Sequence, residues 1–386
     1  MIQKKNKIFA DINVEANYSI FETEHGAKEF HFAITVKKNH SYKEQIKNLY
    51  KAYYNLLEEL RIDKNSAIIR RLFTSDFINQ QDLIEQYLDN NCANSIIEQS
   101  PLSGGKVSIW AYHIIDKNAK TEKKKIGNDL YVSRNNRKHI WTTSLIDTEY
   151  ESSYEQTNAI FNKYNSLLNE NNICLKDNVI RTWIYVQNVD SNYFGVVNSR
   201  RKLFIKHGLT EKTNYISSTG IEGRFNNPRV KVTMDSYAVS GVKKENIKFL
   251  SALEYLNPTQ EYGVTFERAT SVDYGDRRHI FISGTASIDK KGDVIHLGDV
   301  YSQMLRAIQN IEALLKDADA NLDNLSHIII YLRDFTEKEI VEKYIKKRFP
   351  QLPYNLVLAA VCRPSWLIEI EGIAIKEICN TEITAY

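Results

Sequence analysis

Two glutamates near the end of the chain, Glu369 and Glu371, have the residue type and spacing for proton-transfer chemistry. They lie in Trp366–Ile375, where side-chain character alternates with period two, so the sequence predicts a β-strand with both carboxylates on one face. The apolar neighbours predict burial, which raises the pKa of a carboxyl group and makes it a proton donor near neutral pH. The alternative is an edge strand whose solvent-facing side carries both glutamates as surface charges.

Cys362 and Arg363 come just before this strand, at the end of a second strand predicted over Leu356–Cys362. A cysteine on an apolar strand is by default a packing residue. Arg363 either caps the turn or binds a carboxylate.

Arg181 and Tyr185 share one face of a strand predicted over Val179–Val186. A buried arginine needs an anion, which either a substrate or the protein itself supplies. Gly275, in the sequence Tyr274-Gly275-Asp276, has the default interpretation of a turn glycine.

The elements that position these residues recur three times along the 386-residue chain in the order β-α-β-α-β-β. The third copy begins with the strand RRHIFISGT, the middle copy with RKHIWTTS, and a fainter first copy with FHFAIT. We therefore predict three modules, at residues 1–128, 129–245 and 246–386. The charged stretch Asp116–Asn128 is the predicted linker between the first two.

Each predicted module has helices on one face of its sheet only, so the other face must be buried against another element. Three tandem copies solve this problem if their sheets meet around a shared centre. The prediction is an α+β fold in which three modules form a pseudo-trimer within one chain, sheets inside and helices outside. Such a chain needs no oligomer, so we expect a monomer.

Composition and charge exclude several classes of function. The net charge is +3, with 42% hydrophobic and 26% charged residues, so nucleic acid is not an expected partner. The histidines and four cysteines show no metal-ligand spacing, and neither dinucleotide nor P-loop motifs occur. We expect no metal, no cofactor and no membrane span. With no signal peptide and no sign of disulfides, a cytoplasmic location is expected.

The motifs LVLAAV and IEIEGIAI, together with the element order, resemble the Rid (YjgF-like) family, whose members are usually homotrimers with ligand sites at subunit junctions. Deaminating members carry an arginine at the place of Asn355, so deamination is not implied. The last two-thirds more specifically resembles the chorismatases through RTWIYV, STGI, SGTASI, HLGDV and CRPSWLIEIEG.

The chorismatase resemblance implies chorismate as substrate and Glu369 as the acid that protonates its enolpyruvyl group. Gly275 and Cys362 match the members that form 3-hydroxybenzoate and pyruvate. Lys248 stands where the family has a carboxylate-binding arginine, and Arg181, Tyr185 and Arg363 are further expected substrate contacts. The alternatives are a hydrolase giving a dihydroxycyclohexadiene carboxylate, 4-hydroxybenzoate formation, and a non-catalytic protein that binds small acids.

A comparison of the modules predicts a single active site. Aligning their last strands places Ser108 and Thr233 at the position of Glu369. Only the third module therefore carries a carboxylate there, and the first 130 residues show no chemistry of their own.

Overall fold

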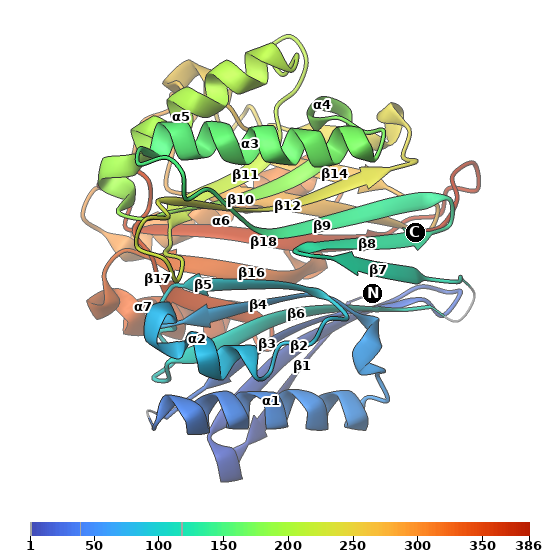
Figure 1. Ribbon diagram of the computed structural model, residues 1–386, viewed down its shortest axis with the longest axis vertical. Coiled ribbons are helices and arrows are strands. Elements are labelled where there is room, and N and C mark those ends of the chain that lie inside the picture. Colours follow the sequence, from blue (N-terminus) through green and yellow to red (C-terminus); the bar gives the residue numbers. More distant parts are fainter. Residues whose placement is uncertain (1, 39, 117–118) are drawn as a thin grey trace.

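The computed structural model describes residues 2–38, 40–116 and 119–386. Three six-stranded sheets meet at the centre, and the long helices lie on the outside (Figure 1). The predicted α+β architecture of three repeated modules is confirmed. Each sheet is mixed, because the strand between the second helix and the last strand pairs parallel to its neighbour.

The strands and the two longer helices follow one scheme in all three modules, and the second module has an additional short helix before its fourth strand. The first contains β1 (Gln3–Phe9), β2 (Val14–Glu22), β3 (Lys28–Val36), α1 (Tyr42–Glu59), β4 (Ala67–Thr74), α2 (Phe77–Glu85), β5 (Ala93–Glu98) and β6 (Val107–Ile115). The second contains β7 (Glu122–Ile126), β8 (Asp129–Arg134), β9 (Arg137–Ile146), α3 (Ser153–Glu170), α4 (Leu175–Asn178), β10 (Val179–Val186), α5 (Val189–Lys206), β11 (Ser217–Glu222) and β12 (Val232–Ser240). The third contains β13 (Ile247–Leu250), β14 (Ala269–Asp273), β15 (Arg277–Thr285), α6 (Val300–Asp317), β16 (Leu325–Leu332), α7 (Lys338–Arg348), β17 (Tyr354–Leu358) and β18 (Ile368–Glu377).

Two strands precede the predicted β-α-β-α-β-β unit in every module, and this is a correction to the sequence prediction. In the second module the additional strand β7 lies within the predicted linker, of which residues 117 and 118 fall outside the described residues. Its lysines alternate, and those that point toward the first module reach backbone carbonyls there. Lys123 Nζ donates to Asn65 at 2.8 Å, and Lys125 Nζ donates to Cys92 at 2.8 Å. A charged segment can thus form an edge strand because its long side chains extend to polar partners.

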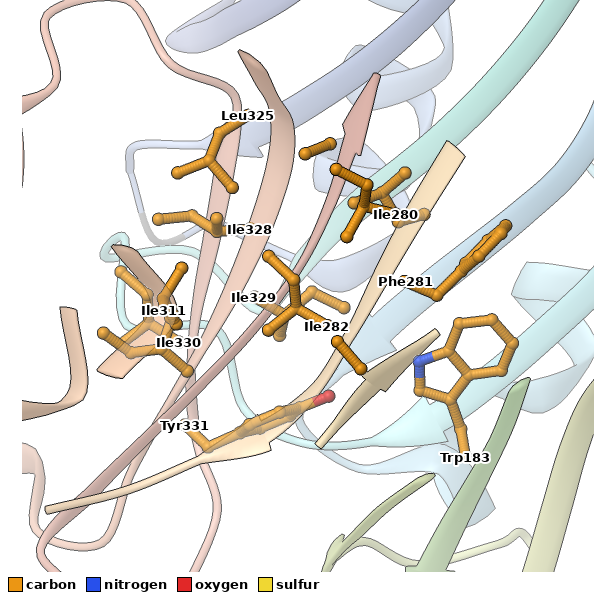
Figure 2. Packing of buried hydrophobic residues seen from close by; sticks show 14 of the residues in the cluster. Trp183, Ile280, Phe281, Ile282, Ile311, Leu325, Ile328, Ile329, Ile330 and Tyr331 are labelled. Carbon is orange, nitrogen blue, oxygen red and sulfur yellow. The ribbon is translucent and has the colours of Figure 1, made fainter. Parts of the chain in front are cut away.

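The third module shows how each sheet is buried on both faces. On its outer face, Ile328 and Ile330 of β16 lie near Ile311 of α6 (Figure 2). On its inner face, Phe281 lies near Trp183, which comes from the second module. The sheets therefore bury one face under their own helices and the other against a neighbouring module.

A buried ion-pair cluster joins the first and third modules near the centre. Glu29 of β3 accepts hydrogen bonds from His279 Nε2 at 2.8 Å and Tyr112 Oη at 2.5 Å, and it pairs with Arg277. Burial alone would raise the pKa of Glu29, but the charges of His279 and Arg277 outweigh it and hold this pKa well below its ordinary value.

Candidate functional site

A pocket lies at the junction between the second and third modules, with about 530 Å³ of empty space that includes its opening to solvent. The two modules meet there through β11 and β15, with Ser218 N donating to Ser283 Oγ at 2.9 Å and Gly284 N donating to Thr219 Oγ1 at 2.9 Å. Glu369, near the start of β18, faces this cavity.

Glu369 is the strongest candidate for chemistry because its environment favours the neutral acid. Burial, followed by the negative charge of Glu371, raises its pKa to about 8, while Arg181 and Arg268 oppose the rise. Its Oε1 atom is buried and has no hydrogen-bond partner among the described residues. A carboxyl group with this pKa is mostly protonated at neutral pH, and its place in the cavity wall makes it a candidate proton donor.

Glu371, two residues along the same strand, has a different role. Its carboxylate accepts hydrogen bonds from Arg181 Nη2 at 2.7 Å and Trp183 Nε1 at 2.8 Å, and also from the Thr219 hydroxyl. These donors occupy both carboxylate oxygens, and all of them belong to the second module. Glu371 therefore links the third module to the second. The two carboxylates thus lie on the same side of the strand, as predicted, but only Glu369 faces the cavity.

Three arginines line the cavity together with Glu369: Arg200 from α5, Arg268 just before β14, and Arg363. Arg268 donates to the backbone and side-chain oxygens of Asn257, both at 3.1 Å. The guanidinium of Arg363 lies over the ring of Trp366, 4.9 Å from its centre. Three cationic groups around one acid make the cavity suitable for an anionic ligand.

Cys362 and Tyr193 form another part of the wall. Burial and the negative charge of Glu369 raise the pKa of Cys362 to about 12, although the hydroxyl of Tyr193, which interacts with the thiol, opposes the rise. Cys362 is therefore a neutral thiol at physiological pH, and such a group is a poor nucleophile.

The structure brings together three of the residues selected from the sequence, Glu369, Cys362 and Arg363, and places the others elsewhere. Arg181 and Tyr185 lie behind the cavity wall, where Arg181 pairs with Glu371. The anion that Arg181 contacts is thus supplied by the protein.

Gly275 and Lys248 lie outside the cavity lining. A β-carbon at residue 275 would be 2.2 Å from the carbonyl oxygen of Ile383, so glycine is required there for close approach of the C-terminal segment. Lys248 is exposed on the edge strand β13.

Several lining residues were not selected from the sequence. Arg200 and Tyr193 are on α5. Arg201, the neighbour of Arg200, does not line the cavity and donates to the carbonyl of Gly263. Arg268 and Gly284 belong to the third module but are more than 80 residues before Glu369. The pair of arginines at 200–201 was the one local signal in the sequence for an arginine at this wall. Helical periodicity alone does not say which of the two faces inward.

Direct hydrogen bonds also cross the two other module junctions. Register places Thr219, Asn355 and Ser95 at equivalent positions in the three sheets. Asn355 Nδ2 donates to Ser108 Oγ at 3.3 Å, and Ser95 Oγ donates to Asp235 at 2.5 Å. The junction holding Thr219 differs from the other two in having the pocket into which Glu369 and three arginines face.

Within the described ranges, no group of three His, Cys, Asp or Glu side chains is arranged to hold a metal ion. In the same part of the chain, no helix is long and apolar enough to cross a membrane.

Comparisons with known proteins find relatives of the third module by its sequence and a similar structure for most of the chain by its fold. The family model described as endoribonuclease L-PSP matches residues 269–376. A RutC family protein of Pyrococcus abyssi is 33% identical over 100 residues, covering 25% of this chain and 79% of that protein. The 3-aminoacrylate deaminase RutC of Acinetobacter baylyi is 28% identical over 97 residues, covering 25% of this chain and 77% of that protein.

Among solved structures, a chorismatase is similar with a TM-score of 0.62 and 17% identity, over 80% of this chain and 93% of that chain. This similarity extends through all three modules. The chain therefore has the fold of a chorismatase, and the predicted resemblance to Rid-like modules is confirmed.

Proposed function

We propose that this chain, which belongs to the RutC family through its third module, is an enzyme that cleaves the enolpyruvyl ether of chorismate. The proposal is carried by one observation: a carboxyl group with a pKa of about 8, that of Glu369, faces a cavity lined by three arginines. Chorismate is a dianion with an acid-labile enol ether, so it matches both the positive lining and the acid. The chorismatase fold supports the same substrate.

In the proposed reaction, Glu369 gives its proton to the methylene carbon of the enolpyruvyl group. Positive charge develops on the ether carbon as an oxocarbenium ion, and cleavage of the bond between the ring carbon and the ether oxygen releases pyruvate. General-acid catalysis of this kind typically accelerates a reaction by about 10²–10⁴-fold. Arg200, Arg268 and Arg363 hold the carboxylates of the substrate, so that the methylene carbon meets Glu369.

We further propose 3-hydroxybenzoate as the ring product. The neighbouring ring hydroxyl attacks the ring carbon, displaces the ether oxygen and forms an epoxide, and its proton returns to the carboxylate of Glu369. The epoxide then opens, its oxygen takes up a proton and the ring loses one, which gives the aromatic acid. Chorismate is then converted to 3-hydroxybenzoate and pyruvate without net uptake of water. Attack by water instead would give the diol, and Cys362 is the side chain proposed to disfavour that outcome by narrowing the cavity or assisting proton movement.

The test is incubation of the purified protein with chorismate while pyruvate release is followed in a coupled assay. Separation of the ring products by chromatography then distinguishes 3-hydroxybenzoate, 4-hydroxybenzoate and the diol. Glu369→Gln removes the proton donor with almost no change in shape, so we expect pyruvate release to be abolished while chorismate binding is retained. Binding of chorismate without any pyruvate release by the unmodified protein would favour a non-catalytic small-acid binder.

A further inference from the structure

A buried arginine of the first module, Arg71 on β4, lies behind the cavity wall, near the ion pair of Arg181 and Glu371. Its side chain is fully buried, and its Nη2 atom is 3.0 Å from Asp235 of the second module. Its Nη1 atom is 4.0 Å from Glu371 of the third module. The guanidinium also lies over the ring of Trp183, 4.5 Å from its centre. One cation thus stands between two carboxylates that belong to two other modules.

The two carboxylates occupy equivalent positions in their sheets. Asp235 lies opposite Trp183 across β10 and β12, and Glu371 lies opposite Ile329 across β16 and β18. Asp235 also accepts hydrogen bonds from Ser95 Oγ at 2.5 Å and from Ser144 N at 2.9 Å. Because this site is buried, the screening by water is weak and a charge 4 Å away has a substantial effect.

The Nη1 atom of Arg71, the one nearer to Glu371, has no hydrogen-bond partner among the described residues. Its Nε atom donates to Ser95 Oγ at 3.3 Å, and Nη2 is directed at Asp235. The part of the guanidinium that faces Glu371 therefore interacts with that carboxylate through charge, without a hydrogen bond that would fix its position.

We propose that Arg71 is a positioning residue for the catalytic acid, because its charge, divided between Asp235 and Glu371, sets how strongly Glu371 repels the ionised form of Glu369. The inference rests on the proposed role of Glu369. It also assigns a part in the site to the first module, whose own last strand has Ser108 in place of the acid. Asp235 then acts in the opposite sense, by drawing the charge of Arg71 away from Glu371.

Glu369 has other charged and titratable neighbours, and the test must separate Arg71 from them. They are Glu371 on its own strand, Arg181 on β10, Arg268 before β14, Tyr331 opposite it on β16, and Tyr193, Arg200, Cys362 and Arg363 around the cavity. Arg71 reaches Glu369 through Glu371. Removing the charge of Arg71 leaves the negative charge of Glu371 less compensated at Glu369. Neutralising Asp235 leaves the charge of Arg71 freer to compensate that of Glu371. The two substitutions should therefore move the titration of Glu369 in opposite directions.

The experiment is infrared titration of the whole chain without substrate. The C=O stretching band of protonated Glu369 is isolated by subtracting the spectrum of the same variant carrying Glu369→Gln. We expect Arg71→Met to raise the midpoint of this titration by about half a unit or more, and Asp235→Asn to lower it. The matched control is Arg70→Met, since Arg70 is equally buried on the same strand but points to the other side, toward Tyr53 and Asp89.

Equal midpoints in Arg71→Met and Arg70→Met, or a shift in the same direction for Arg71→Met and Asp235→Asn, would overturn the role of Arg71. If Arg71→Met does not fold, Arg71→Gln replaces it, and Asp235→Asn carries the second arm. The outcomes remain distinct from those of the proposed function. A protein that shows the opposite shifts but releases no pyruvate refutes chorismate cleavage alone, and one that turns over chorismate with an unmoved midpoint refutes the inference alone.

Discussion

The carboxyl group of Glu369 lies directly against the backbone of Gly284. A β-carbon at residue 284 would be 2.3 Å from Oε1 of Glu369 and 2.7 Å from its Cδ atom, closer than any real β-carbon contact. The amide of the same glycine donates to Thr219 Oγ1 at 2.9 Å across the module junction. The absence of a side chain at one residue therefore determines where the acid stands in the cavity.

Gly284→Ala should consequently lower kcat by about 10²-fold or more while the protein stays folded, because the acid must move away from the reacting carbon. Steady-state kinetics and circular dichroism check the two parts of this expectation. Gly26→Ala is the control, since the open space around Gly26 leaves only a general cost of replacing a glycine with positive φ. An unchanged kcat in Gly284→Ala would mean that Glu369 does not act from the position it occupies here.

The pH dependence of turnover follows from the raised pKa of Glu369. The acid works in its protonated form, so kcat should fall as pH rises through about 8. Glu371→Gln removes a negative charge that favours protonation, which lowers the pKa of Glu369. The falling limb should then move to lower pH, as measured between pH 6 and 10. A limb that stays in place would show that another group sets it.

Cys362→Ala tests the assignment of the ring product. The smaller side chain opens the cavity beside Glu369 and admits water, so the product should shift from 3-hydroxybenzoate toward the diol with pyruvate release retained. Chromatography of the ring products measures the ratio. Tyr193→Phe, which keeps the ring but removes the hydroxyl that interacts with Cys362, is the companion variant. If Cys362→Ala gives the same product ratio as the unmodified protein, Cys362 does not influence which ring product forms.

Two residues are candidates for binding the substrate carboxylate, and kinetics can distinguish them. Arg268 lines the cavity, and Lys248 was selected by the family resemblance. Arg268→Gln should raise KM by about 10–100-fold, as expected for loss of a charge-assisted hydrogen bond to a carboxylate. Lys248→Ala should leave KM unchanged because this side chain is exposed on the edge strand β13. The reverse pattern would place the substrate carboxylate outside the cavity described here.

Stability should depend on the ion-pair cluster around Glu29. Since its folded-state pKa is depressed, Glu29 stabilises the fold above its unfolded pKa, and this contribution is lost as pH falls toward the folded value. At pH 7, Glu29→Gln should cost about 3–5 kcal/mol, because His279 loses its buried carboxylate and Arg277 is left with that of Asp276. Urea unfolding at pH 7 and pH 3 should show the difference shrinking at the lower pH. The exposed pair of Glu22 with Lys28 supplies the control, Glu22→Gln, with an expected cost of less than about 1 kcal/mol.

The sequence predicted the parts of the site that are close together along the chain. Glu369, Cys362 and Arg363 belong to one strand and the turn before it, so local alternation and composition were enough to select them. Arg200, Arg268 and Gly284 reach the cavity only through packing of two modules, which periodicity does not describe. Lys248 and Gly275 were selected by matching this sequence to a family pattern. At the 17% identity found with the chorismatase, such a match can be wrong by a few residues.

The fold was predicted correctly in outline because helices on one face of a sheet require a partner for the other face. Two of the strands added at the start of the modules, β7 and β13, were missed for a physical reason. β7 is rich in lysine and β13 has only four residues, so neither carries an apolar alternation long enough to recognise. Edge strands of this kind are held by pairing and by side chains that reach polar groups, rather than by burial.

Joining three modules in one polypeptide also changes what natural selection can alter. In a ring of identical subunits, every substitution appears at all three junctions at once. Here Thr219, Asn355 and Ser95 occupy matching places with different partners, so each junction can change independently of the other two. A substitution at one junction therefore leaves the contacts at the other two in place.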